Sequence, residues 1–324
     1  MSLNKRLKKL ISIEINEYNK YFYDALKTDV RILDIINRYI VKRKGKELRP
    51  ILTLLSAKIC GSVNNSSFVA STFVQLLHTA TLVHDDVVDN TKERRGFFSI
   101  NALWGSKIAV LVGDFMLSRG MLLALKTKEY DLLEIVSESV KAMSEGELLQ
   151  LEKARKLNQD EDIYFEIINK KTASLISACT SCGAKSANAT EEQFLALKSY
   201  GENLGIAFQL KDDIFDYFKK GAIGKPTLND LKEKKLTLPI IHVLKNIEKK
   251  ERKNILNTIS KYNNNKEKMQ EIADFVIQNG GIEYTANKMD YYIDQSIECL
   301  NCFQDSDIKT ALIELSEYNR YRKE

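Results

Sequence analysis

Apolar residues recur at helical spacing along most of the chain, and few residues interrupt the pattern. The 324 residues include only 14 glycines and 3 prolines, Pro50, Pro226 and Pro239. Residues three and four apart lie on one face of a helix, so these repeats predict amphipathic helices. Because strong helix breakers are rare between the repeats, we expect an all-α protein.

The predicted helices are long, and short polar segments join them. They cover residues 4–43 as one or two helices, then about 50–60, 67–90, 101–127, 131–154, 160–187 and 191–220, with further helices from 236 onward. The predicted loops are GSVNNSS, KERRG, 221–235 and KYNNNKE. Long antiparallel helices with short connections are typical of a bundle. No Pro/Gly/Ser-rich linker divides the chain, so we expect a single domain, residues 1–324.

Charge and cysteine content exclude several classes of protein. The 49 basic and 44 acidic residues give a net charge of +5, which is a mixed surface and not the composition of a nucleic-acid-binding protein. The five cysteines include two C-x-x-C pairs, Cys179/Cys182 and Cys299/Cys302. Structural zinc sites use a much tighter spacing than the segment between these pairs, so we interpret them as thiols of a reducing compartment.

No signal peptide and no long uninterrupted apolar run are evident, so we expect no transmembrane segment. The first residues, MSLNKRLKKLISIEI, form a basic amphipathic stretch that could contact anionic lipid. The interpretation that we favour is a first helix whose Leu/Ile face packs on the rest of the protein.

Two short acidic clusters carry the strongest chemical signal. HDDVVDN contains Asp85, Asp86 and Asp89, and KDDIFDY contains Asp212, Asp213 and Asp216. Both read D-D-x-x-D inside apolar helical sequence, so the first and last carboxylates of each cluster share a helix face. Such carboxylates repel one another unless a cation joins them, and Mg²⁺ shared with a phosphate is the natural one.

One such cluster alone would be weak evidence, because charged helix faces are usually just solvated. Two clusters with identical spacing, each followed by basic residues, favour a metal site over a solvated surface. Lys171 supports this interpretation because a charge in an apolar run requires a partner. His78 lies two turns before Asp85 on the same face, where a core histidine is the alternative. Together these residues predict one metal-rich site and one Arg/Lys-lined site for phosphate groups.

A series of ordered motifs extends over nearly the whole chain. They are G-K-x-x-R-P at 45–50, L-x-H-D-D-V-V-D at 82–89, E-R-R-G at 93–96, G-D-F at 113–115, E-G-E-L-L-Q at 145–150, K-T-A at 171–173, G-x-A-F-Q-x-x-D-D-x-x-D-Y at 205–217, G-K-P at 224–226 and K-x-T-L-P at 235–239. This series resembles the trans-type isoprenyl diphosphate synthases, the polyprenyl synthetases, and among them the long-chain octaprenyl-type branch. The resemblance implies a helical bundle around a central cavity. One departure is Leu228, where the family often has glycine. The resemblance therefore does not specify the path of the 221–235 loop.

The resemblance also implies roles for individual residues. Asp85 and Asp89 bind Mg²⁺ with Asp86 in support, and Asp212 binds it with Asp213 and Asp216 nearby, in a set of three ions. Isopentenyl diphosphate is held by Lys46, Arg49, His78 and Arg95. The allylic diphosphate is held by Arg94, Lys171, Thr172, Gln209 and Lys225, with Lys235 as a weaker candidate. The catalytic group comprises Lys171, Thr172, Gln209, Asp85 and Asp212.

The implied reaction is governed by charge. Mg²⁺ and cationic side chains stabilise the departing pyrophosphate, isopentenyl diphosphate attacks the allylic carbocation, and a proton is lost. The small Ala80 and Thr81 leave the tunnel for the hydrocarbon chain open, with Leu77 and Val74 in the next layers. Met121 and Leu122 are candidates for its floor, and the expected product is about octaprenyl. We also expect a cytoplasmic homodimer with transient membrane contact for product release.

Other functions remain as alternatives. A shorter-chain farnesyl or geranylgeranyl diphosphate synthase would keep the same motifs and differ in its product. A non-catalytic subunit of a heteromeric synthase should lack an acidic cluster or a basic ligand, and this chain lacks neither. A terpene cyclase would not need the Lys46/Arg49/His78/Arg95 site. A histidine-aspartate phosphohydrolase needs several metal-binding histidines, and only three histidines are present.

Overall fold

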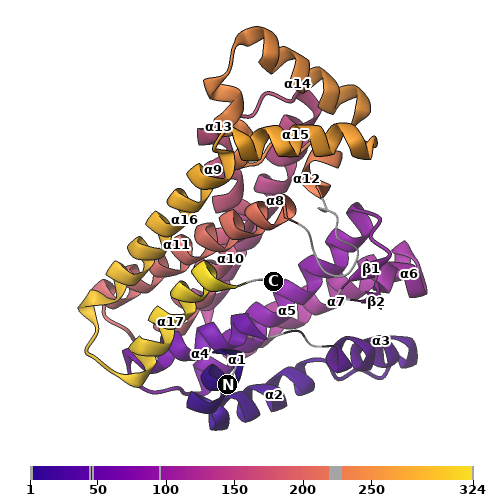
Figure 1. Ribbon diagram of the computed structural model, residues 1–324. Helices are drawn as coiled ribbons and strands as arrows, with labels where there is room; N and C mark the ends of the chain where they lie inside the picture. The colour runs from indigo at the N-terminus through magenta and orange to yellow at the C-terminus, as the bar shows by residue number, and fades with distance from the viewer. Residues whose placement is uncertain (1–2, 44, 46, 95, 219–227, 323–324) are drawn as a thin grey trace. The chain divides into compact units, whose positions relative to one another are not determined.

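The computed structural model describes residues 3–43, 45, 47–94, 96–218 and 228–322, and these are almost entirely helical (Figure 1). The prediction of an all-α fold is confirmed, since the only strands among these residues are β1 Glu93–Arg94 and β2 Phe97–Phe98. The chain divides into two compact units, which are described one at a time. Unit 1 comprises Met1–Ser137, Ala178–Lys198 and Cys302–Leu312, and unit 2 comprises Glu138–Ser177, Ser199–Asn301 and Ile313–Glu324. The single-domain boundary at 1–324 stays a prediction.

Unit 1 is built around one central apolar helix. Its helices are α1 Leu3–Leu10, α2 Ser12–Ala25, α3 Arg31–Lys42, α4 Leu48–Cys60, α5 Asn65–Val88, α6 Ile100–Trp104 and α7 Ser106–Lys126, together with segments of α8 Tyr130–Lys156, α10 Ser174–Ser186, α11 Glu191–Asp216 and α17 Asp307–Tyr321. The central helix α5 packs against α7, α4 and α2. Its buried side chains include Phe73, Val74 and Leu77. These apolar contacts are the main source of stability for this unit.

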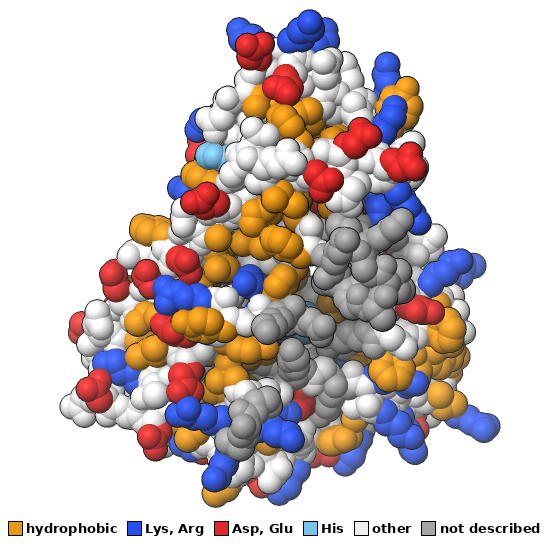
Figure 2. All heavy atoms as spheres, viewed as in Figure 1, with side chains coloured by type: hydrophobic (Ala, Val, Ile, Leu, Met, Phe, Trp, Pro, Cys, Tyr) orange, Lys and Arg blue, Asp and Glu red, His pale blue; other side chains and the backbone are white. Residues whose placement is uncertain are grey.

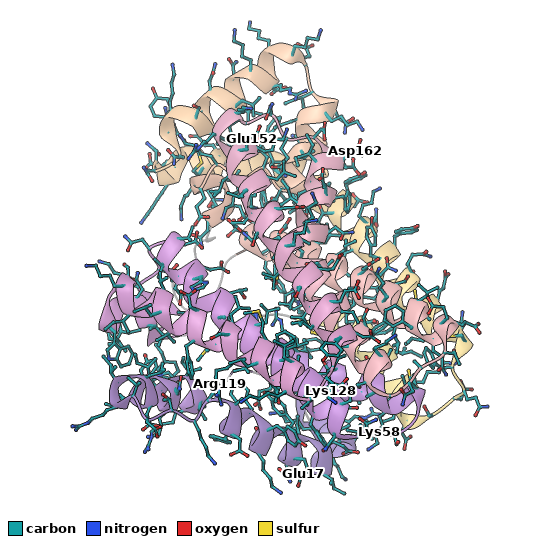
Figure 3. The ribbon with its side chains drawn as sticks, turned by 180° about the vertical axis from the view of Figure 1, so that it is seen from behind. Glu17, Lys58, Arg119, Lys128, Glu152 and Asp162 are labelled. Carbon is teal, nitrogen blue, oxygen red and sulfur yellow. The ribbon has the colours of Figure 1, made fainter. Side chains whose placement is uncertain are left out.

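Polar contacts attach the N-terminal helices to this core. Lys58 of α4 donates to Leu10 O at the end of α1 (3.1 Å) and forms an ion pair with Glu14 of α2. Arg119 of α7 donates from Nε to Ala25 O at the end of α2 (2.6 Å). Figure 3 labels Lys58 and Arg119 on these helices. Both cations satisfy carbonyl groups at helix C-termini, which have no partner inside their own helix.

The helix boundaries differ from the predicted ones at three places in unit 1. Residues 4–43 form three helices, not one or two. The loop before α5 is shorter than predicted, because Asn64 caps the helix by accepting a hydrogen bond from Ser67 N (3.2 Å). The predicted helix 101–127 is divided into α6 and α7 at Gly105, which has φ 83°. A left-handed residue ends a helix, and glycine adopts that conformation at little cost.

Unit 2 combines long helices with a C-terminal helical layer. Its elements are most of α8 Tyr130–Lys156, α9 Glu161–Ile168, the π-helical turn η1 Asn169–Ala173, the start of α10 Ser174–Ser186, most of α11 Glu191–Asp216, α12 Asn229–Lys232, α13 Leu238–Asn246, α14 Lys249–Tyr262, α15 Lys266–Gln278, α16 Gly281–Glu298, the start of η3 Cys299–Cys302 and most of α17 Asp307–Tyr321. Helix α13 packs against α9, α15 and α16, as can be followed in Figure 1. Leu238, Ile240 and Ile293 lie in the shared apolar core of these helices.

The five cysteines are free thiols. Cys179 and Cys182 are fully buried in α10, and burial raises the pKa of Cys179 to about 12. A thiol with so high a pKa stays protonated and acts as a small apolar side chain.

The surface carries both signs of charge (Figure 2), and helices α5 and α7 are strongly apolar. On the face shown in Figure 2, Lys and Arg side chains are mixed with Asp and Glu. Among the described residues, two helices, α5 and α7, are long and apolar enough to cross a membrane by length and composition alone, a test that core helices also pass. Within the apolar window of each helix, α5 is 72% buried, as a core helix is, whereas α7 is 33% buried.

Candidate active site

The first acidic cluster lies at the C-terminal end of α5. The helix ends at Val88, and Asp89 caps it by donating its N–H to Asp85 O (2.8 Å). Asp86 is 4% exposed, Asp85 is half-buried and Asp89 is exposed. A helix C-terminus carries a partial negative charge, and the last turn of α5 contains no Lys or Arg to offset it. The negative charge of the carboxylates and the partial negative charge of the helix end therefore add, which creates a strong local preference for a cation.

The G-D-F motif holds this end of α5 in place. His84 Nε2 lies 3.1 Å from Val110 O and 3.5 Å from an oxygen of Asp114, both on α7. A Cβ atom at Gly113 would lie 2.1 Å from the same nitrogen, so only glycine leaves room for the imidazole. His84, beside the aspartate pair, and Gly113 of G-D-F thus pack directly against each other.

Glu93 and Arg94 of the E-R-R-G motif form one strand of a short strand pair, where a loop was predicted. Strands β1 and β2 pair antiparallel, with Arg94 opposite Phe97. The hairpin is attached to the acidic helix because Thr91 N donates to Asp86 O (2.9 Å) and Ser99 Oγ donates to Thr91 O (2.7 Å). This arrangement brings the backbone of the motif to the end of α5.

The remaining predicted residues of unit 1 lie on α4 and α5. Arg49 is in the first turn of α4, and its charge lies close enough to Cys179 to oppose the rise in the pKa of that thiol. His78 is buried in α5, as are Val74, Leu77 and Ala80, whereas Thr81 is half-buried and donates to His78 O (2.9 Å). Lys46, Arg95 and Lys225 lie outside the described residues, as does the side chain of Arg94.

The predicted tunnel floor stays a prediction. Its candidates on α7, Met121 and Leu122, are 37% and 45% exposed. The buried side chains of α7, the helix that packs on α5, are Ala109, Val112, Met116 and Ala124. Periodicity alone does not tell which face of an all-round apolar helix is buried, so only the structure identifies the buried side of α7.

In unit 2, Lys171 and Thr172 lie in the π-helical turn η1. Lys171 donates to Gln150 Oε1 (2.8 Å) and forms an ion pair with Glu147. The widened turn is enclosed on two sides by glycines: a Cβ at Gly146 would lie 3.0 Å from Lys171 N, and one at Gly205 would lie 2.6 Å from Ala173 Cα. Such π turns are frequent at functional sites because they redirect side chains out of the regular helix.

A chain of hydrogen bonds links this turn to the second acidic cluster. Thr172 Oγ1 donates to Gln209 Oε1 (2.8 Å), and Gln209 Nε2 donates to Asp213 Oδ1 (2.8 Å). The other oxygen of Asp213 accepts from the Tyr164 hydroxyl (2.5 Å). Asp213 is 2% exposed, and burial, followed by the charge of Asp230, raises its pKa. Both oxygens of Asp213 are therefore occupied by neutral donors that fix its orientation.

The third carboxylate of this cluster organises the following segment. Asp216 is the last residue of α11, and its two oxygens accept from Asn229 N and Asp230 N (both 3.0 Å). It thus binds the amino end of α12. Burial, followed by the charge of Asp216, raises the pKa of Asp230 to about 7, and the nearby Lys235 opposes this rise.

Leu228 is the departure from the family pattern, and the structure shows how a leucine is accommodated at this position. It precedes α12 with φ 46°, a left-handed conformation that favours glycine, which the family often has at this position. The leucine side chain is 4% exposed, so apolar burial offsets the backbone strain.

Asp212 differs from the other two carboxylates because its side chain is 45% exposed. It forms an ion pair with Arg322, close to the C-terminus. As in α5, the last turn of α11 contains no Lys or Arg, so helix dipole and carboxylates again add.

The donor sets suit a hard divalent cation. Both clusters offer carboxylate oxygens, which Mg²⁺ prefers, at helix ends that favour positive charge. Within the described parts of the chain, no three His, Cys, Asp or Glu side chains close around a metal by themselves. This is compatible with Mg²⁺, which usually keeps water and phosphate oxygens among its ligands.

Several residues of this network were not among the predicted site residues. They are Tyr164, Glu147, Gln150, Asp230 and Arg322. Glu147 and Gln150 belong to the E-G-E-L-L-Q motif, and Tyr164 lies two helical turns before Lys171, so helical spacing could have indicated them. Arg322 is distant in sequence from its partner, and no local pattern marks it.

Comparisons with known proteins agree with these motifs. Residues 30–276 match the family model "Polyprenyl synthetase". The octaprenyl diphosphate synthase of Escherichia coli (strain K12) is 33% identical over 317 residues, which are 98% of each chain. A decaprenyl diphosphate synthase from Rhodobacter capsulatus has a similar structure, with a TM-score of 0.92, 34% identity and 98% of each chain covered.

A further solved structure bears on the ligands. It is a polyprenyl synthase from Caulobacter crescentus CB15 complexed with calcium and isoprenyl diphosphate, with a TM-score of 0.90 and 33% identity. The match covers 99% of this chain and 98% of that one. With the two acidic helix ends and the ordered motifs, these matches show that the chain belongs to the polyprenyl synthetase family and is a trans-prenyltransferase.

Proposed function

We propose that this enzyme condenses an allylic diphosphate with successive isopentenyl diphosphate units to give an all-trans polyprenyl diphosphate of about octaprenyl length. The observation that carries the proposal is the position of both D-D-x-x-D clusters at the C-terminal ends of long helices. There the carboxylates and the helix dipole add, and neither last turn contains a Lys or Arg to neutralise them. Magnesium ions shared with a diphosphate would supply the positive charge that neutralises these helix ends.

In this proposal Asp85, Asp89 and Asp212 are the carboxylates that hold magnesium. The metal, three ions in all, would neutralise the diphosphate and stabilise the leaving pyrophosphate. Asp213 and Asp216 act differently, because their oxygens already accept hydrogen bonds from Gln209, Tyr164 and the start of α12. They position the metal-binding end of α11.

Lys171, Thr172 and Gln209 serve the allylic diphosphate. The π turn and the Thr172–Gln209 hydrogen bond hold two polar side chains together, and Glu147 and Gln150 keep the Lys171 ammonium in place. A preorganised ammonium stabilises the negative charge that develops on the leaving group better than a mobile one. Arg94 and Lys225 are assigned to the same diphosphate from the sequence, with Lys235 as the weaker candidate.

Isopentenyl diphosphate is assigned to the basic group of unit 1. Arg49 begins α4, and His78 is buried in α5; Lys46 and Arg95 complete the set from the sequence. Arginine binds phosphate through fixed, paired N–H groups, so no metal is required for this substrate. The separate site distinguishes the proposal from a terpene cyclase.

Ala80, Leu77 and Val74 form a buried row along α5 that leads away from Asp85. In the proposal the growing chain follows this row, with Thr81 beside its entrance. The small Ala80 leaves the path open, which supports a product longer than farnesyl or geranylgeranyl. A shorter-chain synthase is the second candidate, and a non-catalytic subunit is the third.

One incubation tests these candidates together. The protein is mixed with farnesyl diphosphate, labelled isopentenyl diphosphate and MgCl₂, and the dephosphorylated products are separated by chromatography. Products near octaprenyl length support the proposal, whereas farnesyl or geranylgeranyl products support the second candidate. The absence of any labelled prenyl product would refute a catalytic role for this chain.

We further propose a homodimer in the cytoplasm that contacts membranes only to release its product. The apolar face of α7 supports the dimer, since Leu111, Leu122 and Leu125 are 45–66% exposed. A two-fold contact between copies of this helix would cover that face, as is usual for homo-oligomers.

A further inference from the structure

Arg322 contacts three residues, Phe208, Asp212 and Phe215, on the side of α11 that carries the second acidic cluster. Its Nη2 donates to Asp212 Oδ1 and to Phe208 O (3.0 Å). The guanidinium also lies 4.0 Å from the centre of the Phe208 ring and 5.3 Å from that of Phe215. The Arg322 side chain is only 7% exposed, so this is a fixed position and not a surface ion pair.

The chain end is anchored immediately before Arg322. Arg320 binds Asp290 (3.0 Å), Glu317 (2.9 Å) and Asp294, and its carbonyl accepts a hydrogen bond from Lys211 (3.3 Å). Arg322 can therefore leave Asp212 without detaching α17. The movement needs only Arg322, which follows Tyr321, the last residue of the helix.

The hydrogen-bonding capacity of the Arg322 guanidinium is not fully used. Its Nε is buried and has no hydrogen-bond partner within the described chain. An imperfectly satisfied buried cation exchanges more readily than a fully satisfied one.

Asp212 is also the carboxylate of this cluster that a metal would use. The oxygens of Asp213 and Asp216 accept from neutral donors, whereas Asp212 is half exposed and holds Arg322. A guanidinium and a divalent ion cannot share Asp212 Oδ1 at bonding distance. Metal binding at this oxygen therefore requires the arginine to leave.

We propose that Arg322 is a resident counter-cation of Asp212 that exchanges with Mg²⁺, so that metal binding at the second acidic cluster releases Arg322. Without metal, the arginine neutralises Asp212 at the negative end of α11. With metal, the divalent ion takes over this role. The inference rests on the proposed role of Asp212 as a magnesium ligand.

The first test compares Mg²⁺ binding by wild type, Arg322→Met and Arg252→Met. Arg252 is exposed on α14, so its replacement removes the same charge away from the cluster. MgCl₂ is titrated calorimetrically without substrate, and the unfolding temperature is followed at each concentration. Because a competing cation lowers apparent affinity, Arg322→Met should bind Mg²⁺ about fivefold more tightly than wild type. Arg252→Met should match wild type.

A structural role alone would give a different result. Arg322→Met would then unfold at a lower temperature while its Mg²⁺ affinity stayed at the wild-type value, and this outcome overturns the proposal. If wild type and Arg322→Met both fail to bind Mg²⁺, the proposal fails together with the metal role of Asp212. If wild type forms prenyl products but Arg322→Met shows no gain in affinity, only the exchange is refuted.

The second test uses wild type alone and does not depend on a variant that folds. Trypsin cleavage after Arg322 is followed by mass spectrometry with and without MgCl₂, and cleavage after Arg252 serves as the internal control. We expect Mg²⁺ to accelerate cleavage at Arg322 severalfold and to leave cleavage at Arg252 unchanged. Equal rates at Arg322 in both conditions would contradict release of Arg322.

Discussion

Replacing Tyr164 by phenylalanine tests the buried network that orients the second acidic cluster. The change removes one hydroxyl, and with it the 2.5 Å hydrogen bond to Asp213 Oδ2, without altering the shape of the side chain. At a pH above the raised pKa of Asp213, where its carboxyl group is ionised, a hydrogen bond to this charged group contributes about 1.5–3 kcal/mol. Since Asp213 is 2% exposed, water does not replace the lost donor at little cost. We therefore expect Tyr164→Phe to lower the free energy of unfolding by about 1.5–3 kcal/mol.

Tyr200 provides a matched control in the same unit. It is also fully buried, and its hydroxyl accepts a long hydrogen bond, 3.4 Å, from the neutral Ser316. A neutral hydrogen bond contributes about 1 kcal/mol, so Tyr200→Phe should cost less than Tyr164→Phe. Urea unfolding of the three proteins at the same pH measures both differences. Equal losses for the two variants would refute the view that Tyr164 supports a carboxylate.

The same substitution should also affect turnover. Asp213 holds Gln209, and Gln209 accepts from Thr172, so a displaced carboxylate disturbs both proposed ligands of the allylic diphosphate. We expect Tyr164→Phe to lower kcat by about tenfold, the loss that about 1.4 kcal/mol of transition-state stabilisation produces. Tyr200→Phe should keep wild-type kinetics. A Tyr164→Phe enzyme with unchanged kcat would show that this network supports the fold and not the reaction.

Three further predictions concern the metal, the product and the assembly. Asp85→Ala should lower turnover by orders of magnitude without lowering the unfolding temperature, because it removes a carboxylate from the negative end of a helix; near-normal activity at ordinary Mg²⁺ would contradict the metal assignment. Ala80→Phe should shift the product towards farnesyl or geranylgeranyl diphosphate while the first condensation continues, and an unchanged product in chromatography would refute the proposed path along α5. Light scattering at micromolar concentration should give the mass of a dimer, and Leu111→Lys should shift it towards the monomer; a wild-type monomer would refute the contact through α7.

Local sequence was sufficient for the fold class and for most helix positions. The helices around Asp85, Lys171 and Asp212 were predicted because apolar spacing and the scarcity of breakers act over short range. The division at Gly105, the hairpin of E-R-R-G and the π turn at Lys171 were not predicted. The π turn is enclosed by Gly146 and Gly205, which are distant in sequence, whereas the division at Gly105 and the hairpin are local changes of backbone conformation that apolar spacing does not report.

The sequence by itself also determined the chemistry of the site. Two D-D-x-x-D clusters and a lysine in an apolar helix are local features, and they were enough to predict carboxylates for a metal and cations for phosphate. Only the tertiary structure decided how the three carboxylates of the second cluster differ. Asp213 is buried against Tyr164, Asp216 binds the start of α12, and Asp212 pairs with Arg322. The reason is physical: burial and partners depend on helices that meet in space, and one helix shows only the spacing of its own side chains.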